Sequence, residues 1–356
     1  MNIGNEKNLI FLLILSHNIS FASHFMGGEI TWECIKSGPD AGKYVFEMKV
    51  YRDCNGIPFS QISQTLTHHN YPAVGQTTPI LLNFISATDI SPIGSLLSGN
   101  ACFDCTQSQQ GAVEEFIWRS DPMVLAGAPP PEGWHFTWGS SARSGAITNG
   151  MANLSWTLRA VMYSYTDASG TILPTANTCH DSSPEFKEQA KTIICTGYEF
   201  SYSHNASDSE LDDLKYSWAE PLGTSGNYDP SNPNSIALAF TAPYSVNSPI
   251  PGNPSLDSLT GEITYLSNTS GVFVTCIKVE ARKCGQLVAE IYREVQVVLL
   301  DCANFYQDIQ DGFNDPPEIS GAFVDPITGL PTYEKNVYAG ELVQFNIEAE
   351  DFDVYS

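Results

Sequence analysis

The amino-acid sequence predicts an all-β protein, and three observations support this fold class. Apolar and polar residues alternate with a period of two in several runs, as they do on strands with one buried face. Clusters of Gly, Pro, Asn and Ser separate these runs at the places where turns are needed. No stretch of convincing length shows the apolar period of an amphipathic helix. We therefore expect β-sheets packed face to face.

The first 22 residues predict an export signal. Residues 1–22 have a short polar start, an apolar run from Leu9 to Leu15, and small residues at Ser20 and Ala22. This is the layout of a cleaved secretory signal, and the apolar run is too short to span a bilayer. The alternative, an uncleaved anchor, fits the short run and the small-residue box less well. We expect a secreted mature chain that begins near residue 23.

The first predicted domain spans residues 23–178 and opens with a hairpin. In "EITWEC", Ile30, Trp32 and Cys34 lie on one face, and "KYVFEMKVY" alternates in the same way after the turn sequence "SGPDAG". The glycine pair 27–28 allows the backbone to approach a neighbour closely just before the first strand. The runs "EEFIWRS", "GWHFTW" and "NLSWTLRAVMYSY" predict further strands.

A second domain is predicted over residues 179–302. The order of a strand, an acidic loop, a strand, a long loop and further strands suits an immunoglobulin-like sandwich. After a linker over residues 303–314, "DPPEI" repeats the earlier "SSPEF", and "ELVQFNIEAEDFD" repeats "YEFSYSHNASDSE", which places Asp351 at the position of Asp208. Residues 315–356 therefore predict the start of a second sandwich in a longer array. The expected architecture is an N-terminal β-sandwich-like domain followed by tandem immunoglobulin/cadherin-like β-sandwiches.

The charge of the chain is strongly acidic. Forty acidic residues against sixteen basic ones give a formal net charge of −24. Such a surface repels phosphate backbones, so we expect no nucleic-acid partner. Divalent cations are the one ligand class that the charge favours.

Cysteine usage fits an oxidising compartment, because every cysteine follows the predicted cleavage site. The count is odd, so one thiol is expected to be free or to pair outside the chain. The spacing Cys102-x-x-Cys105 could belong to a zinc or redox site, but no second such pair follows, and structural disulfides are favoured. The disulfide candidates are Cys34, Cys54, Cys102, Cys105, Cys179, Cys195, Cys276, Cys284 and Cys302.

An ordered set of segments carries a resemblance to a known family. "GGEITWEC", "YRDCNGIP", "SSPEF", "ICTGYEFSYSHNASD" and "GEITYLSNTSGVFVTCIKVEA" through "REVQVVLLDC" resemble the N-terminal region of very large Bacteroidota surface proteins. In that family, immunoglobulin-like repeats follow, and the chain ends in a gliding-motility-associated domain that directs type IX secretion. The resemblance implies an adhesin-like protein on the exterior of the outer membrane.

The chain departs from this family at one segment. Ser140-Ser141-Ala142-Arg143 stands where the family is expected to show Cys-Cys-Arg-Asn. The departure leaves the family's disulfide pairing open and offers one reason for the odd cysteine count.

The best ligand candidate is an acidic loop after a predicted strand. Flexible acidic loops can supply the oxygen ligands that calcium prefers, and the resemblance adds that cadherin-like repeats often carry Asp-x-Asp at this place. A solvated acidic hairpin is an equally good interpretation. The candidate calcium ligands are Asp208, Glu210, Asp212 and Asp213, with Asp351 and Asp353 at the equivalent position of the next repeat.

Two other residue groups have weaker functional interpretations. His68 and His69 are adjacent, and adjacent strand residues point to opposite faces, so a loop pair is favoured over a shared metal. Four tryptophans could form a sugar-stacking platform, although core positions are more usual for them in sandwiches. These tryptophans are Trp118, Trp134, Trp138 and Trp156.

The sequence predicts a protein without enzymatic activity. No GxSxG, HExxH or phosphate-binding loop is present, although a glycosidase carboxylate pair would meet only in the fold. We expect a structural, adhesin-like module whose partners are extracellular contacts, glycans or like chains, with calcium as the one candidate cofactor. The alternative is a secreted carbohydrate-binding or glycan-degrading protein that uses the aromatics of the first domain.

Overall fold

Strands make up nearly all the regular structure of the computed structural model, and the described residues contain no α-helix. The structure describes residues 25–54, 56, 59, 62–71, 79–91, 112–175, 178–190, 193–301, 318–319, 321, 323–333, 335–338, 343, 345 and 349–350. The all-β prediction is confirmed. Within the described residues, no helix has the length and apolar character needed to cross a membrane.

The strands of residues 1–302, one of two compact units, fall into a large sheet and several small ones. They are β1 (Phe25–Cys34), β2 (Tyr44–Asp53), β3 (Gln64–His69), β4 (Ile80–Asp89), β5 (Val113–Ser120), β6 (Trp134–Ser140), β7 (Trp156–Met162), β8 (Tyr165–Thr166), β9 (Ile172–Leu173), β10 (Glu185–Phe186), β11 (Ile193–Cys195), β12 (Glu199–Ser203), β13 (Ala206–Ser207), β14 (Asp213–Trp218), β15 (Ser255–Leu256), β16 (Glu262–Leu266), β17 (Gly271–Lys283) and β18 (Gln286–Leu300), with the single 3-10 turn η1 (Ser225–Asn227).

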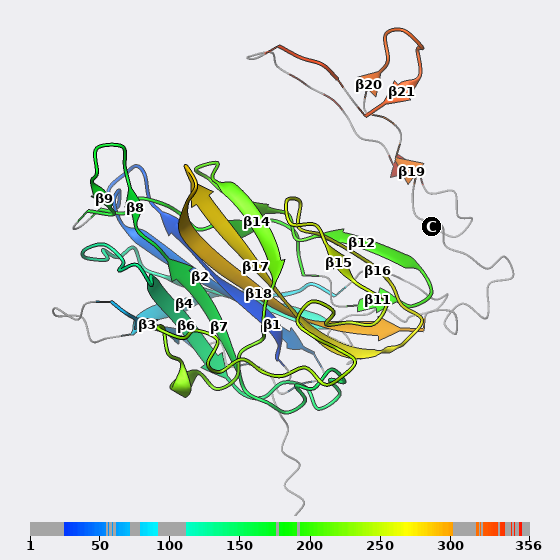
Figure 1. The fold of residues 1–356 in the computed structure, drawn as a ribbon, viewed down its shortest axis with the longest axis horizontal. Coiled ribbons are helices and arrows are strands. Elements are labelled where there is room, and N and C mark those ends of the chain that lie inside the picture. The colour runs from blue at the N-terminus through cyan, green and yellow to red at the C-terminus, as the bar shows by residue number, and fades with distance from the viewer. Residues whose placement is uncertain are drawn as a thin grey trace, which may run out of the picture. The chain divides into compact units, whose positions relative to one another are not determined.

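The large sheet has the strand order β1-β2-β5-β4-β3-β6-β7-β18-β17-β14 (Figure 1). Strand β1, at one end of this order, also pairs with β18, and β11 adds to β18 in the parallel direction. The first and the last long strands of the unit are therefore hydrogen-bonded to each other.

The predicted opening hairpin is confirmed. Strands β1 and β2 pair antiparallel from Gly27↔Tyr51 to Cys34↔Tyr44. The alternating residues Ile30, Phe46 and Met48 are fully buried, because a strand with a period of two turns every second side chain into the core.

The glycine pair before the first core residues has the predicted role of close backbone approach. A Cβ on Gly27 would lie 2.0 Å from the backbone oxygen of Glu294, and one on Gly28 would lie 2.5 Å from that of Lys49. Gly27 also has a φ of 148°. Any larger residue would therefore push β1 away from β18 on one side and from β2 on the other.

The predicted division between residues 178 and 179 does not separate two compact units, because both halves share strand β18. One edge of β18 pairs along its length with β17. Its other edge pairs in succession with β7 at 289–291, with β1 at 293–295 and with β11 at 298–300. The compact unit ends at Cys302, where the second domain was expected to end.

The C-terminal half of this unit brings two groups of strands together. Strands β12, β16 and β15 form a separate three-stranded sheet, and β14, β17, β18 and β11 form the end of the large sheet. Residues from both groups, including Ile263, Tyr265, Val274 and Val297, belong to the same buried core. Apolar side chains of two sheets are thus covered by one another, which is the main stabilising arrangement of such a fold.

The second compact unit, residues 303–356, contains two short antiparallel pairs among its described residues. Strand β19 (Glu318–Ile319) pairs with β22 (Ala349–Glu350), and β20 (Phe323–Val324) pairs with β21 (Pro331–Thr332). The β20–β21 turn is closed by Asp325, whose Oδ1 accepts from the backbone N–H groups of Ile327 and Thr328 at 2.8 and 2.7 Å.

Candidate functional site

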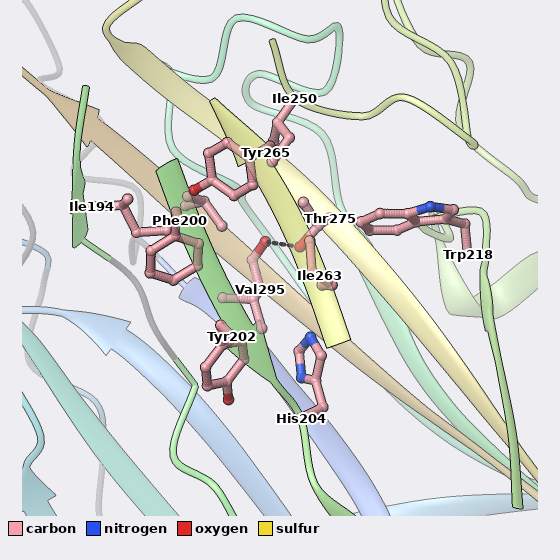
Figure 2. Close-up of a pocket in the computed structure, with 11 residues that line it drawn as sticks. Ile194, Phe200, Tyr202, His204, Trp218, Ile250, Ile263, Tyr265, Thr275 and Val295 are labelled. Atoms are coloured by element: carbon pink, nitrogen blue, oxygen red, sulfur yellow. Dashed lines mark hydrogen bonds between the residues drawn. The ribbon is translucent and has the colours of Figure 1, made fainter. Parts of the chain in front are cut away.

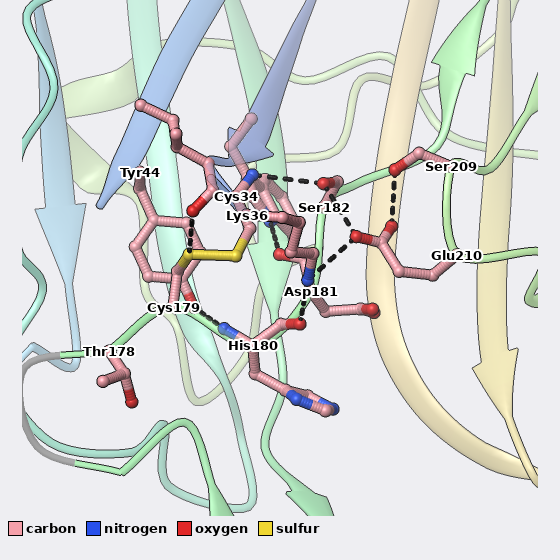
Figure 3. Close-up of a disulfide and its surroundings, with 12 residues drawn as sticks. Cys34, Lys36, Tyr44, Thr178, Cys179, His180, Asp181, Ser182, Ser209 and Glu210 are labelled. Atoms are coloured by element: carbon pink, nitrogen blue, oxygen red, sulfur yellow. Dashed lines mark hydrogen bonds and ion pairs between the residues drawn. A yellow bond between two sulfur atoms is a disulfide. The ribbon is translucent and has the colours of Figure 1, made fainter. Parts of the chain in front are cut away.

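A group of charged and polar contacts surrounds the disulfide Cys34–Cys179, which joins the end of β1 to the segment 178–184 (Figure 3). The S–S distance is 2.02 Å, and 145 residues of sequence separate the two cysteines. We call this region the disulfide junction: Cys34, Cys179, segment 178–184, loop 208–212, and the lysines Lys36 and Lys283.

Segment 178–184 is fastened to β1 by its own side chains and backbone. Ser183 Oγ accepts from the backbone N–H of Trp32 at 2.9 Å, and Ser182 Oγ accepts from that of Cys34 at 3.1 Å. The indole Nε1 of Trp32 donates to the carbonyl of Asp181 at 3.1 Å. Small hydroxyl residues suit this position because they satisfy strand N–H groups without filling the space between segments.

The acidic loop 208–212 is an Asp-anchored turn. Asp208 Oδ1 accepts from the backbone N–H groups of Glu210 and Asp212 at 2.9 and 3.1 Å. This turn holds Leu211 in the left-handed region with a φ of 61° and leaves its side chain exposed. The loop is therefore ordered by its own hydrogen bonds.

Lysines form ion pairs with Glu210 and Asp212, two of the carboxylates that the sequence predicted as calcium ligands. Lys36 Nζ lies 3.0 Å from Glu210 Oε1. Lys283 Nζ, at the tip of the β17–β18 hairpin, lies 2.9 Å from Asp212 Oδ2 and 2.6 Å from Asp181 Oδ1. The lysine contacts join four chain segments: the turn after β1, segment 178–184, the acidic loop and the long hairpin.

The pKa shifts at the disulfide junction reflect burial opposed by these contacts. Burial raises the pKa of Asp181 to about 7, against the opposing hydrogen bond from Lys283. Burial also raises the pKa of Asp208. For Glu210, burial acts upward, but hydrogen bonds from Ser209 and Lys36 outweigh it and lower the pKa. Asp181 Oδ2 and Asp208 Oδ2 are buried without a hydrogen-bond partner in the described part of the chain.

The calcium prediction gains no support from this geometry. No group of three His, Cys, Asp or Glu side chains in the described part of the chain could hold a metal ion. Asp213 is exposed on β14, opposite Arg282 of β17, and does not join the loop carboxylates in a shared centre. Asp351 and Asp353 lie outside the described residues.

The histidine pair lies in strand β3, so the prediction of a loop was wrong, while the opposite orientation of the rings is confirmed. His69 Nε2 lies 2.8 Å from Thr137 Oγ1 of β6. The His68 ring instead packs edge-on against Tyr71, with ring centroids 5.2 Å apart. The two imidazoles therefore have different neighbours and cannot share one ion.

The four tryptophans considered for a sugar-stacking platform all lie in the core, so the prediction of such a platform was wrong. Each of Trp118, Trp134, Trp138 and Trp156 is at most 6% exposed. Their rings pack on other aromatic side chains; Phe25, for example, contacts both Trp138 and Trp156. A buried indole face cannot stack on a sugar.

The cysteines divide into disulfide-bonded and free residues. Besides Cys34 and Cys179, both Cys54 and Cys195 are disulfide-bonded. Cys276 is free and buried, and Cys284 is free and exposed, which corrects the disulfide assignment of these two residues and the expectation of at most one free thiol. Cys102, Cys105 and Cys302 lie outside the described residues.

Two buried ion pairs tie β18 to the N-terminal half, and sequence reasoning missed both. Arg293 Nη2 donates to Glu29 Oε1 at 2.9 Å, and its Nε donates to Oε2 of the same carboxylate. Arg143 donates through Nε and Nη2 to the two oxygens of Glu294, each at 2.8 Å. The sequence indicated a buried ion pair only through a charged residue inside an otherwise apolar strand, as at Glu29.

A cavity of about 30 Å³ lies between the three-stranded sheet and strands β17 and β18 (Figure 2). Its lining is mainly apolar and aromatic, and it includes Phe200 and Ile263. Tyr265 Oη and His204 Nδ1 also belong to lining residues and are buried without a hydrogen-bond partner in the described region. The volume has room for about one or two water molecules. It is a packing gap of the core and is too small for an organic ligand.

Comparisons with protein-family models, with curated proteins and with solved structures give no match to this chain.

Proposed function

We propose that this chain is an extracellular structural protein of the adhesin type, exposed on the cell surface, which acts through stiffness and contact. The observation that carries the proposal is the sharing of β18 between the two halves of residues 25–301. Strands from the N-terminal half pair with one edge of β18, and the C-terminal half pairs with the other edge. The two halves therefore cannot move as separate domains without breaking sheet hydrogen bonds.

The buried ion pairs and the disulfide support the same proposal, because they hold distant segments of the chain together. The buried pairs Glu29–Arg293 and Arg143–Glu294 and the disulfide Cys34–Cys179 all join segments more than a hundred residues apart. Removing one partner of a buried pair costs about 3 to 5 kcal/mol. A disulfide that closes a loop of 145 residues adds about 5 kcal/mol in the chain-entropy account. Such ties suit a protein that must hold its shape outside the cell.

We further propose that residues 193–300 form an immunoglobulin-like sandwich. Its support is the strand connectivity: β12, β16 and β15 in one sheet, and β14, β17, β18 and a parallel β11 in the other. This arrangement of seven strands in two sheets is the one expected for that fold.

A second sandwich beginning near residue 315 is supported by a repeated strand pair. Strands β10 and β13 pair as Glu185↔Ser207 and Phe186↔Ala206. Strands β19 and β22 pair as Glu318↔Glu350 and Ile319↔Ala349. These are the segments that the sequence repeat matched, "SSPEF" with "DPPEI" and the stretch before Asp208 with the stretch before Asp351. Equal local pairing at equivalent positions is the expected sign of tandem modules.

Protease treatment of intact cells that produce the protein tests the proposal. We expect added protease to remove the protein while a cytoplasmic marker survives, and cells that lack the gene to attach less well to a surface or to one another. Full protection of the protein in intact cells, with degradation only after lysis, would contradict a surface role.

A further inference from the structure

Strand β4 leaves one edge of the large sheet open. β4 pairs with β5 from Leu82 to Asp89, with a register shift at Ile85, between Phe84 and Ser86, but it pairs with β3 only at Ile80, Leu81 and Leu82. In the described part of the chain, no backbone partner faces residues 83–88 on the β3 side. About half the backbone N–H and C=O groups of such a strand point outward and can bind another strand. We call residues 83–88 the β4 edge.

The side chains around the β4 edge are apolar and exposed. Ile85 is 57% exposed, Leu81 on the same strand is 52% exposed, and Ile62, just before β3, is 62% exposed. A groove of about 200 Å³ lies at the beginning of β4, before the β4 edge, with Leu81, Pro79 and Tyr71 in its lining. Soluble proteins seldom leave an open strand edge and several large aliphatic side chains together without a partner.

The sequence keeps charge away from this region. Residues 54–88 contain no Asp, Glu, Lys or Arg, although charged residues make up 16% of the chain. Charge on an edge strand is the usual means of preventing strand addition. The charge-free stretch includes β3 and all of β4 except its last residue.

Strand β14, which ends the strand order of the large sheet, carries the charge that the β4 edge lacks. It carries Asp213 and Lys215, and its Tyr216 backbone N–H already donates to the carbonyl of Ser258 at 2.9 Å. One edge is therefore charged and partly covered, while the β4 edge is neutral and open.

We propose that the β4 edge binds the β4 edge of a second copy of this chain, antiparallel, so that the two large sheets become continuous. Charge favours this occupant. Two chains of net charge −24 repel each other over most of their surfaces, and a neutral strip is a place where two copies can meet without that repulsion. An antiparallel pair of identical strands also satisfies the two-fold symmetry of most homodimers.

The contact is small, so the dimer is weak in solution. A pairing of one short strand falls well below the roughly 1,200 Å² of a stable interface. Many copies on two facing surfaces would add their contacts, as multivalent binding does. The inference rests on the proposed surface function only for its biological role, because strand pairing can be measured on the purified chain.

Sedimentation velocity of the full chain tests this pairing. All samples carry Cys284→Ser, because an exposed thiol could itself link two chains. We expect the monomer–dimer equilibrium to shift toward dimer as protein rises to about 0.5 mM and as NaCl screens the repulsion. Ile85→Lys should weaken dimerisation at least tenfold. Ile172→Lys, which changes an isoleucine of matched 55% exposure in β9, should leave it unchanged.

Disulfide crosslinking tests the register in which the two β4 edges pair. In the same background, oxidation of an Ile85→Cys variant should give disulfide-linked dimers, whereas Ile172→Cys should give few. A chain that stays monomeric at high protein and salt concentration would overturn the inference, as would an Ile85→Lys variant that dimerises like its parent. Binding of a neutral glycan that Ile85→Lys abolishes, in a chain that remains monomeric, would assign this edge to a different partner.

Discussion

Replacing Glu29 by Gln tests whether the buried ion pairs hold the two halves of the large unit together. The change preserves the shape of the side chain and removes its charge. Arg293 then keeps a buried guanidinium without a carboxylate partner, although it still contacts the carbonyl of Glu188 at 2.8 Å and the ring of Phe186 at 4.1 Å. Tyr51 also loses a charged acceptor.

The size of the effect follows from the burial of the pair. Both Glu29 and Arg293 are 1% exposed, so solvent screens neither charge. Leaving one member of such a pair uncompensated costs about 3 to 5 kcal/mol. For a unit of roughly 280 residues, about 4 kcal/mol corresponds to a fall in melting temperature of about 7 °C.

Chemical denaturation with guanidinium, followed by tryptophan fluorescence, measures this loss. The double variant Glu29→Met with Arg293→Met is the control, because replacing both charges by apolar groups should restore most of the stability. A loss below about 1 kcal/mol for Glu29→Gln, with an unchanged denaturant slope, would refute the role of the pair.

Four further predictions follow from the same structure. Replacing both Cys34 and Cys179 by Ser should lower the free energy of unfolding by up to about 5 kcal/mol; a change below about 1 kcal/mol in denaturant titrations would show that the staple is dispensable. Thiol titration of the native protein should label Cys284 rapidly and Cys276 only after unfolding, because burial raises the pKa of the Cys276 thiol; equal labelling rates would contradict its burial. Burial raises the pKa of Asp181 from 3.8 to about 7, so its contribution to stability should be complete below about pH 4 and lost as the pH rises through 7; Asp181→Asn should flatten that part of the stability–pH curve, and an unaltered curve would rule this assignment out. Millimolar calcium should leave the melting temperature equal to that in sodium chloride of the same ionic strength, since lysines occupy the acidic loop; a calcium-specific rise would restore the metal interpretation.

The sequence by itself determined the features that depend on neighbouring residues. Alternation with a period of two identified β1 and β2, because each side chain's face depends only on its place in the strand. The same local logic placed the glycine pair at a close approach and the two histidines on opposite faces. The repeat between residues 182–186 and 315–319 stays a prediction from the sequence, on which the proposed second sandwich rests.

The tertiary structure alone decided which distant residues meet. Glu29 and Arg293 are 264 residues apart, and the local sequence around either residue does not predict that they form an ion pair. The acidic loop was predicted to be either a calcium site or a solvated hairpin, but Asp208 is buried, and Lys283 reaches Asp212 because β14 pairs with β17 at Asp213↔Arg282. The boundary predicted between residues 178 and 179 does not separate two compact units, because strands from both sides of it pair with β18. Local propensity fixes where strands begin and end, whereas packing of the whole chain fixes their neighbours, and therefore whether a carboxylate faces a metal, a lysine or water.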